Sequence, residues 1–201
     1  LEGPRYGLPI GRDVMLQQLV RDFNRTSTST SPIADRNNTL DSLFRMMKEM
    51  DAPKIVETGC VRGQDDWGGG CFGDLGGVYG RGQLTGGDMA PHTGEAARHI
   101  CRYWPCEVVC SDSVAYLRDR AEDIDVLYLD SMDCEHAEHA AHGLRELQTA
   151  EKLLKSGSVV VYDDTAWAGQ WTGKGALGVP WALQHNYNLV TCGYQTILRK
   201  Q

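Results

Sequence analysis

One short segment, residues 54–63, restricts the fold of this chain more than any other stretch. Its first part contains the adjacent β-branched residues Ile55 and Val56, which favour an extended backbone. Gly59 follows closely, and a glycine can adopt positive φ angles and leaves room for a ligand to approach the backbone. The segment therefore predicts a buried strand that ends at Glu57 and runs into a sharp turn. In an open parallel sheet, ligands bind at that edge, although any strand-to-helix turn of an α/β protein also fits this pattern.

Acidic residues recur where the other predicted strands of this kind end. Each of these runs is short and rich in apolar or β-branched residues, and an aspartate follows it within two residues. The predicted strands and the acids that follow them are 83–87 with Asp88, 107–110 with Asp112, 124–129 with Asp130, and 158–162 with Asp163 and Asp164.

The order of these acids resembles that of the class I S-adenosylmethionine (SAM)-dependent methyltransferases. The resemblance implies that Glu57 lies near the methionine amino group of SAM, that Asp88 holds the ribose hydroxyls and that Asp112 lies beside the adenine. The other cofactor-binding positions that it implies are Gly59, Arg62, Gly63, Ser113 and Asp130.

Two alternative functions follow from the same pattern. The first is a nicotinamide-dependent oxidoreductase, but such enzymes carry Gly-x-Gly-x-x-Gly after the first strand, and the turn at residues 59–63 reads Gly-Cys-Val-Arg-Gly. The second is a non-catalytic module with a SAM-binding fold. The acids at both the cofactor and the metal positions argue against that reading, because a scaffold has no need of them.

Strands and helices alternate from residue 54 onward, and two further strands, at 189–192 and 195–199, close the chain as an antiparallel pair. The resemblance implies a three-layer, Rossmann-like α/β sandwich with a mostly parallel seven-stranded sheet. We expect a single domain, residues 1–201, in which 1–52 form a helical extension and 53–201 form the catalytic core. Residues 32–38 are predicted to form a loop, and helices are predicted at 13–23, 40–50, 72–79, 92–103, 114–120, 135–154 and 179–185.

Asp130, Asp163 and Asp164 follow two strands that we expect to be neighbours in the sheet. Three carboxylates packed together repel one another unless a cation neutralises them, and oxygen ligands favour Mg²⁺ or another hard divalent ion. Metal-dependent O-methyltransferases of the catechol and macrocin types resemble this arrangement. The resemblance implies that Mg²⁺ holds the acceptor hydroxyls and acidifies the one that is methylated. Helix capping by one Asp, with the others solvated, is the alternative.

A histidine-rich segment follows Asp130, with histidines at 136, 139 and 142. His142 is the first candidate for the general base that takes the acceptor proton, with Glu146 one turn further on to orient it. His139 and Asp133 are the alternatives, because the macrocin-type pattern Asp-Gly-Asp is one residue longer here. A zinc site that includes Cys134 and a solvated polar helix face are two further interpretations.

Composition restricts the partners of the chain. The net charge is −7 and the pI is near 5.3, which argues against a nucleic-acid partner. No run approaches the length of a membrane span, and the seven cysteines form no evident disulfide framework, so we expect a cytoplasmic protein. Trp67, Trp167 and Trp171 fall in predicted loops over the ligand edge and suggest a carbohydrate or aromatic polyol as acceptor. Apolar residues in the amino-terminal helices suggest a homodimer.

Overall fold

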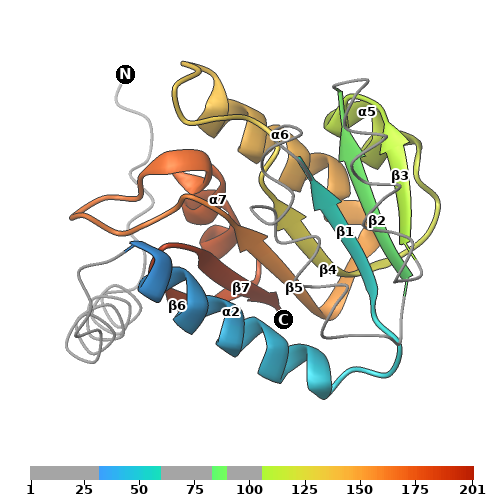
Figure 1. Ribbon diagram of the computed structural model, residues 1–201, viewed down its shortest axis with the longest axis horizontal. Helices are drawn as coiled ribbons and strands as arrows, with labels where there is room; N and C mark the ends of the chain where they lie inside the picture. The colour runs from blue at the N-terminus through green and yellow to red at the C-terminus, as the bar shows by residue number, and fades with distance from the viewer. Residues whose placement is uncertain (1–31, 60–82, 90–105) are drawn as a thin grey trace, which may run out of the picture.

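The computed structural model describes residues 32–59, 83–89 and 106–201 (Figure 1). The seven strands predicted from the sequence all fall within these ranges. The helices predicted at 13–23, 72–79 and 92–103 lie outside them, as do Arg62, Gly63 and Trp67.

A seven-stranded sheet runs through the described part of the chain, in the order β3-β2-β1-β4-β5-β7-β6. The first five strands are parallel, whereas β7 is antiparallel to both β5 and β6. This topology confirms the predicted Rossmann-like sheet with its closing antiparallel pair. The strands are β1 (Lys54–Thr58), β2 (Gln83–Asp88), β3 (Cys106–Cys110), β4 (Ile124–Leu129), β5 (Leu154–Tyr162), β6 (Tyr187–Cys192) and β7 (Thr196–Lys200).

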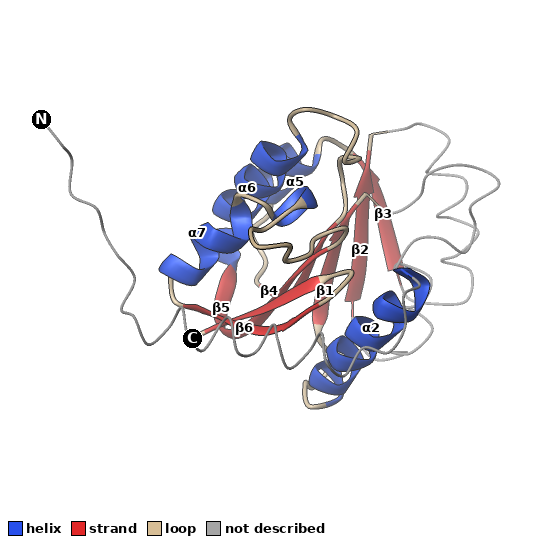
Figure 2. Ribbon diagram, turned by 90° about the vertical axis from the view of Figure 1, so that its left-hand side faces the viewer, coloured by secondary structure: helices blue, strands red, loops and turns tan. Residues whose placement is uncertain are grey.

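Helices cover both faces of this sheet and complete three layers. Among the described helices, α2 lies on one face, whereas α5, α6 and α7 lie together on the other (Figure 2). The helical elements are α2 (Pro32–Lys48), α5 (Ser113–Asp119), α6 (His139–Ala150), α7 (Gly178–Gln184) and the short 3₁₀ turns η1 (Glu151–Leu153) and η2 (Gly173–Gly175).

The alternation of side chains along the strands divides the core between the two faces. On β5, Val159 and Val161 pack in one cluster with Leu43 and Met47 of α2, whereas Val160 belongs to the cluster under the other helices. Because both faces of β5 are buried, its sequence reads as a continuous apolar run, which is typical of a central parallel strand.

Helix α2 begins earlier than predicted. Residues 32–38 were expected to form a loop before a helix at 40–50, but the helix starts at Pro32 and ends at Lys48. A proline is compatible with the first turn of a helix, because its missing N–H has no intrahelical partner there. The loop prediction was therefore wrong, and the polar residues before Leu40 are helical.

The boundary between α6 and β5 also differs from the prediction of a helix at 135–154. The helix is limited to His139–Ala150, and Leu154 already pairs with Ile124 of β4. Residues 155–157, expected to end the helix, instead lie within β5, opposite a shift in pairing register between Ile124 and Val126. Gly157 has φ +92°, which a glycine adopts readily, and it lets the strand bulge at this point.

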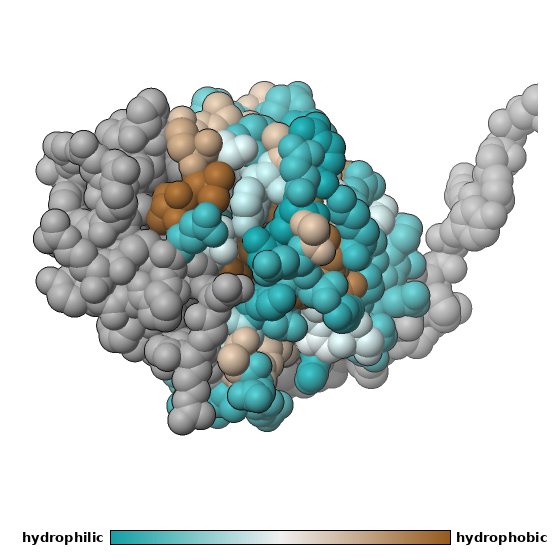
Figure 3. Space-filling model, turned by 90° about the vertical axis from the view of Figure 1, so that its right-hand side faces the viewer, coloured by the Kyte–Doolittle hydropathy of each residue, from teal (hydrophilic) through white to brown (hydrophobic). Residues whose placement is uncertain are grey.

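The described surface is mostly hydrophilic on the face shown in Figure 3, with several smaller groups of apolar atoms among the hydrophilic ones. Among the described helices, none has the length and apolar character needed to cross a membrane. On α2, Leu43 and Met47 are fully buried against the sheet, so packing within the chain uses these two apolar residues.

Candidate active site

The candidate site lies where β1, β4 and β5 end side by side. The backbone N–H of Asp130 donates to the carbonyl of Thr58 (2.9 Å), and the N–H of Asp163 donates to that of Leu129 (3.1 Å). The sheet hydrogen bonding thus continues one residue past each strand and fixes both aspartates at the edge. The strand order also reverses between β1 and β4, and ligands of open α/β sheets bind at such a reversal.

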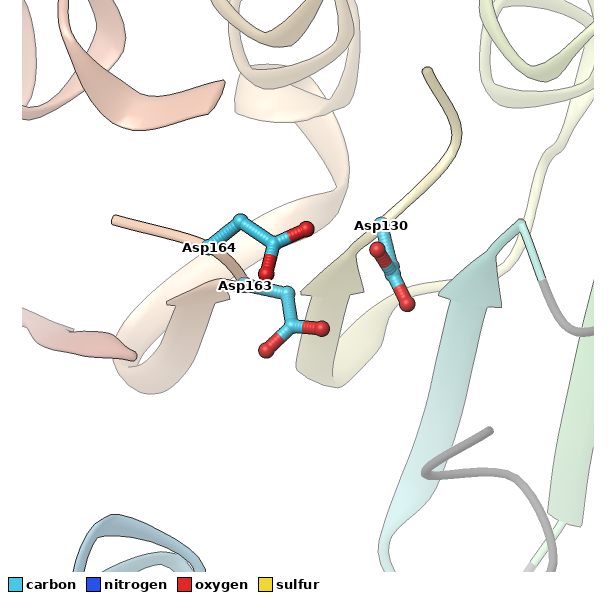
Figure 4. A group of neighbouring side chains, drawn as sticks. All are labelled: Asp130, Asp163 and Asp164. Atoms are coloured by element: carbon cyan, nitrogen blue, oxygen red, sulfur yellow. The ribbon is translucent and has the colours of Figure 1, made fainter. Parts of the chain in front are cut away.

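Asp130, Asp163 and Asp164 converge at this edge, as predicted (Figure 4). One ligand oxygen of each lies within 4.8 Å of the others. Asp163 is buried, and Asp164 adopts a φ of +45°, in the left-handed region that aspartate tolerates better than most residues. Among the residues that the structure describes, this trio is the one group of three metal-ligating side chains that come this close.

Lys174 is a component of the site that the sequence interpretation missed. Its side chain is only 3% exposed, and its Nζ contacts Oδ1 of Asp130 and lies 3.2 Å from Oδ2 of Asp164. The same ammonium lies 3.2 Å from the backbone carbonyl of Asp130. A lysine is almost never this buried unless it is paired, so the acids determine its position.

Glycines bring the backbone of η2 close enough for this contact. At Gly173, which has φ +67°, a Cβ would clash with the carbonyl oxygen of Asp164. At Gly175, a Cβ would lie 2.6 Å from the Thr165 side chain, and at Gly143 of α6 it would lie 2.6 Å from the carbonyl oxygen of Lys174. The two glycines that flank Lys174 in the sequence were therefore the signal that could have identified it.

Burial and charge shift the pKa values of this cluster. Burial, and then the carboxylate of Asp163, raise the pKa of Asp130 to about 7, although Lys174 acts in the opposite direction. Burial lowers the pKa of Lys174, but Asp130 and Asp164 outweigh that effect and leave the pKa above its usual value.

The donor set of this cluster fits a divalent cation. Lys174 supplies one positive charge to three carboxylates, so two negative charges remain when all three are ionised. The carboxylates also offer only oxygen ligands, which Mg²⁺ prefers. The residues that could hold such an ion are Asp130, Asp163 and Asp164, with the Lys174 ammonium in contact with the first and the last.

His142 lies in a buried polar network beside this cluster. Its Nε2 is 3.0 Å from Oγ of Ser113 and 3.5 Å from Oε1 of Glu146, and that glutamate accepts a hydrogen bond from Ser131 (2.8 Å). Glu146 is the main reason that the pKa of His142 is raised. The predicted pairing of His142 with Glu146 is thus present, and the network links the loop after β4 to the start of α5.

The two other candidates for the base lie nearer the surface. His139 is half-buried, and its Nδ1 is 2.7 Å from the carbonyl oxygen of His136. Asp133 is half-buried as well. Cys134 and the histidines form no metal-ligating group in the described residues, so the zinc interpretation receives no support from the structure.

The predicted cofactor positions are only partly described. Glu57 is fully buried on β1, and β2 ends at Asp88. Asp112 caps α5, because its Oδ1 accepts from the N–H of Ala115 (2.8 Å). Gly59 has φ +78°, and a Cβ there would clash with the backbone of Asp130, so close packing of β1 on the loop after β4 requires this glycine.

The loop after β5 carries two of the tryptophans that were expected near the acceptor. Trp167 and Trp171 pair through a β-bridge and stack edge to face, with ring centroids 5.0 Å apart. Trp171 is buried, and Trp167 is half-buried against the same core. Trp171 therefore stabilises the loop, and Trp167 is the more accessible of the two rings.

Comparisons with known proteins identify the fold through structure alone. No protein-family model matches the chain, and no curated protein matches it in sequence. Solved structures of methyltransferases do match it.

Three of these structures illustrate the different methyltransferases that share this fold. The MycE methyltransferase of the mycinamycin biosynthetic pathway, in complex with Mg and SAH, matches at 17% identity and a TM-score of 0.59, over 80% of this chain. CalS11, a TDP-rhamnose 3′-O-methyltransferase of calicheamicin biosynthesis, matches at 16% identity and a TM-score of 0.52, over 96% of both chains. A putative rRNA-methylase from Clostridium thermocellum matches at 13% identity and a TM-score of 0.54, over 81% of this chain and 97% of its own.

At these identities the likeness establishes the fold alone. The chain spans about half the length of MycE, 49% of that chain. Its fold is that of the SAM-dependent methyltransferases, and the resemblance inferred from the strand-end acids is confirmed. The structural neighbours include O-methyltransferases as well as a putative RNA methylase, so the acceptor has to be argued from the site.

Proposed function

We propose that this protein is a SAM-dependent O-methyltransferase that methylates a hydroxyl of a sugar or small natural product with the help of Mg²⁺. The observation that carries the proposal is the convergence of Asp130, Asp163 and Asp164 at the sheet edge, next to the strand-order reversal. These carboxylates would hold Mg²⁺, which, when bound, would orient acceptor oxygens and lower the pKa of the reacting hydroxyl.

Two of the structural neighbours support this choice of acceptor and metal. MycE was solved with Mg and SAH, and CalS11 is a TDP-rhamnose 3′-O-methyltransferase. A putative rRNA-methylase shares the fold, but the net charge of −7 is unfavourable for binding a phosphate backbone. Trp167 in the loop after β5 is a candidate ring for stacking on a sugar or an aromatic acceptor.

The remaining site residues are proposed from their positions. SAM would lie over the carboxyl ends of β1, β2 and β3, with the whole chain acting as one domain. Cys110, Cys134 and Cys192 are free thiols, which is compatible with a cytoplasmic location. The residues proposed for SAM binding are Glu57, Gly59, Arg62, Gly63, Asp88, Asp112, Ser113 and Asp130.

Methyl transfer to a hydroxyl requires a group that takes the acceptor proton as the oxygen–carbon bond forms. We propose His142 as this base, because Glu146 raises its pKa and the Glu146–Ser131 hydrogen bond ties the pair to the residue after Asp130. His139 and Asp133 are the alternatives. A positioned base contributes about 10²- to 10⁴-fold to such a rate.

A coupled experiment tests the proposal. Thermal shifts with SAM, NAD and MgCl₂ identify the ligands, because a ligand that binds only the folded state raises the melting temperature. Production of S-adenosylhomocysteine is then measured with sugar nucleotides, glycosides and catechols, with Mg²⁺ or with excess chelator. We expect a shift with SAM and turnover that chelation abolishes. A rise in melting temperature with NAD and none with SAM would reject the methyltransferase function. Full turnover in excess chelator would reject the role of the metal.

Variants assign the base in the same assay. His142→Gln should lower the turnover rate by about 10²- to 10⁴-fold and leave SAM binding intact. His139→Gln and Asp133→Asn test the alternatives. His185→Gln is the matched control, because His185 is exposed just after the end of α7, where it stacks on Trp181 and bonds to the carbonyl oxygen of that residue. Unchanged turnover in His142→Gln would transfer the role to whichever alternative shows the loss.

A further inference from the structure

A line of buried hydrogen bonds runs from helix α2 to the acid trio. Tyr128 of β4 donates from its hydroxyl to Oδ1 of Asp163 (3.1 Å). Nε2 of Gln195 donates to the Tyr128 hydroxyl (2.5 Å), and the Thr39 hydroxyl of α2 donates to Oε1 of Gln195 (2.5 Å). All four side chains are at most 2% exposed. We call these four residues the Thr39–Asp163 relay.

The direction of these bonds follows from the chemistry of the last member. An ionised carboxylate only accepts hydrogen bonds, so the Tyr128 hydroxyl has to donate to Asp163. That hydroxyl then accepts from the amide nitrogen of Gln195, which turns the amide oxygen toward Thr39. Every donor therefore points toward Asp163, and bonds aligned in this way polarise and strengthen one another in a buried environment.

The relay joins parts of the molecule that have no local connection in sequence. Thr39 and Gln195 are 156 positions apart. Thr39, Leu43 and Met47 recur every four residues and so form one stripe of α2, and all three are fully buried. Leu43 and Met47 pack beside Tyr128 in the same apolar cluster. Docking of α2 by its apolar residues thus also places the first donor of the relay.

We propose that Tyr128 is a positioning residue for Asp163 and that Gln195 and Thr39 extend this role to α2. The inference rests on the proposed divalent-cation site. The bond from Tyr128 holds one oxygen of the Asp163 carboxylate, and because the carboxylate is planar, it also sets the direction of the other. Helix α2 would then help to orient a metal ligand, in addition to packing on the sheet.

The test uses Mn²⁺ as the probe and the full chain. Binding of MnCl₂ is measured by electron paramagnetic resonance and calorimetry, together with binding of S-adenosylhomocysteine. Tyr128→Phe removes only the hydroxyl and should raise the Kd for Mn²⁺ by about 10- to 100-fold, the usual effect of removing a partner of a metal ligand. The Kd for S-adenosylhomocysteine should stay the same, which a general loss of structure would not allow.

Tyr187→Phe is the matched control. Tyr187 is also a buried tyrosine that donates to a carboxylate, that of Glu151 (2.5 Å). In the sheet, Tyr187 pairs with Lys200 at one end of β7, whereas Thr196, at the other end, pairs with Tyr162, the residue before Asp163. This variant should change neither Kd. If it weakens Mn²⁺ binding as much as Tyr128→Phe does, the effect belongs to tyrosine loss in general and the inference is overturned.

Two further variants test the relay beyond Tyr128 and keep the inference open to refutation if Tyr128→Phe misfolds. Thr39→Val removes one hydroxyl at constant volume and should raise the Kd for Mn²⁺ in the same direction by a smaller factor. Gln195→Glu replaces the donor facing Tyr128 with an acceptor, so that the Tyr128 hydroxyl is drawn away from Asp163. It should weaken Mn²⁺ binding more than Thr39→Val does.

The outcomes separate this inference from the function on which it rests. If the wild type binds Mn²⁺ and folded relay variants bind it equally well, the relay has no positioning role although the metal site stands. If the wild type binds no Mn²⁺, the metal part of the proposed function and the inference fall together. Weakened Mn²⁺ binding in the relay variants, with S-adenosylhomocysteine binding unchanged, supports both.

Discussion

Replacing Lys174 with methionine tests the electrostatic description of the site. Methionine keeps most of the length and volume of the side chain and removes the ammonium that contacts Asp130 and Asp164. Breaking a buried ion pair by removing one partner costs about 3–5 kcal/mol, because the remaining charge is left uncompensated. The lower end applies here, since Asp130, whose pKa is already about 7, can take up a proton in place of the lysine charge.

A loss of about 3 kcal/mol corresponds to a fall of about 6–12 °C in melting temperature for a domain of this size. The measurement is calorimetric or fluorescence-detected unfolding of the metal-free protein at pH 8. The matched control is Lys155→Met, because Lys155 also pairs with an aspartate, Asp123, but both side chains are largely exposed. Solvent screens an exposed pair, which therefore contributes little to stability, so the control should shift the melting temperature far less than Lys174→Met does.

Divalent ions should then stabilise the variant more than the wild type. Without the ammonium, an ion that displaces the proton from Asp130 meets three carboxylates and no competing positive charge, and tighter binding raises the melting temperature further. The expected result is a larger upward shift with MgCl₂ in Lys174→Met than in the wild type. The view that lysine and metal share these carboxylates would be refuted if the variant had the melting temperature of the wild type. It would also be refuted if MgCl₂ raised the melting temperature of the variant no more than that of the wild type.

Three further predictions address the cofactor, pH and assembly. Asp88→Ala should weaken SAM binding by about 1–3 kcal/mol in calorimetry, since ribose hydroxyls would lose their partner, and unchanged affinity in a folded variant would show that β2 is misaligned with the cofactor. The pKa of His142 is raised above 6.5, so its contribution to stability is fully present below pH 6.5 and is lost as the pH rises through the folded-state pKa. Urea unfolding across that pH range should show a declining free energy of unfolding in the wild type but not in His142→Gln. An equal dependence of this free energy on pH in the two proteins would contradict the prediction. Light scattering at micromolar concentration should give the mass of a homodimer, and a monomer mass would reject that expectation.

The fold was predictable because its signals are local. The central strands β4 and β5 are mostly buried on both faces and therefore read as largely apolar runs, as in residues 159–161 of β5. The acids that define the edge follow their strands directly, and parallel strands bring such residues together without further information. Asp130 and Asp163 were placed correctly for this reason, with their N–H groups still bonded to the neighbouring strands.

The errors arose where pairing and packing decide the boundary. Residues 155–157 combine a lysine with a glycine, which is a common helix ending. Leu154 nevertheless pairs with β4 in the sheet, and the glycine lies in a bulge of β5. Residues 32–38 carry the polar character of a loop and are nevertheless helical. The Thr39–Asp163 relay has no sequence signature at all, because its members are joined only when α2 docks on the sheet.

Lys174 shows how a correct argument from the sequence reached an incomplete site. Repulsion among three aspartates predicts a cation, and the chain itself supplies one through a lysine that lies between two glycines. One ammonium cannot neutralise three carboxylates, and the pKa of Asp130 stays near 7 in its presence. The lysine therefore makes burial of the acids tolerable in the folded protein, while the charge that remains matches that of a divalent ion. Lys174 and the proposed Mg²⁺ are thus complementary, because the lysine neutralises one carboxylate charge and leaves the rest for the metal ion.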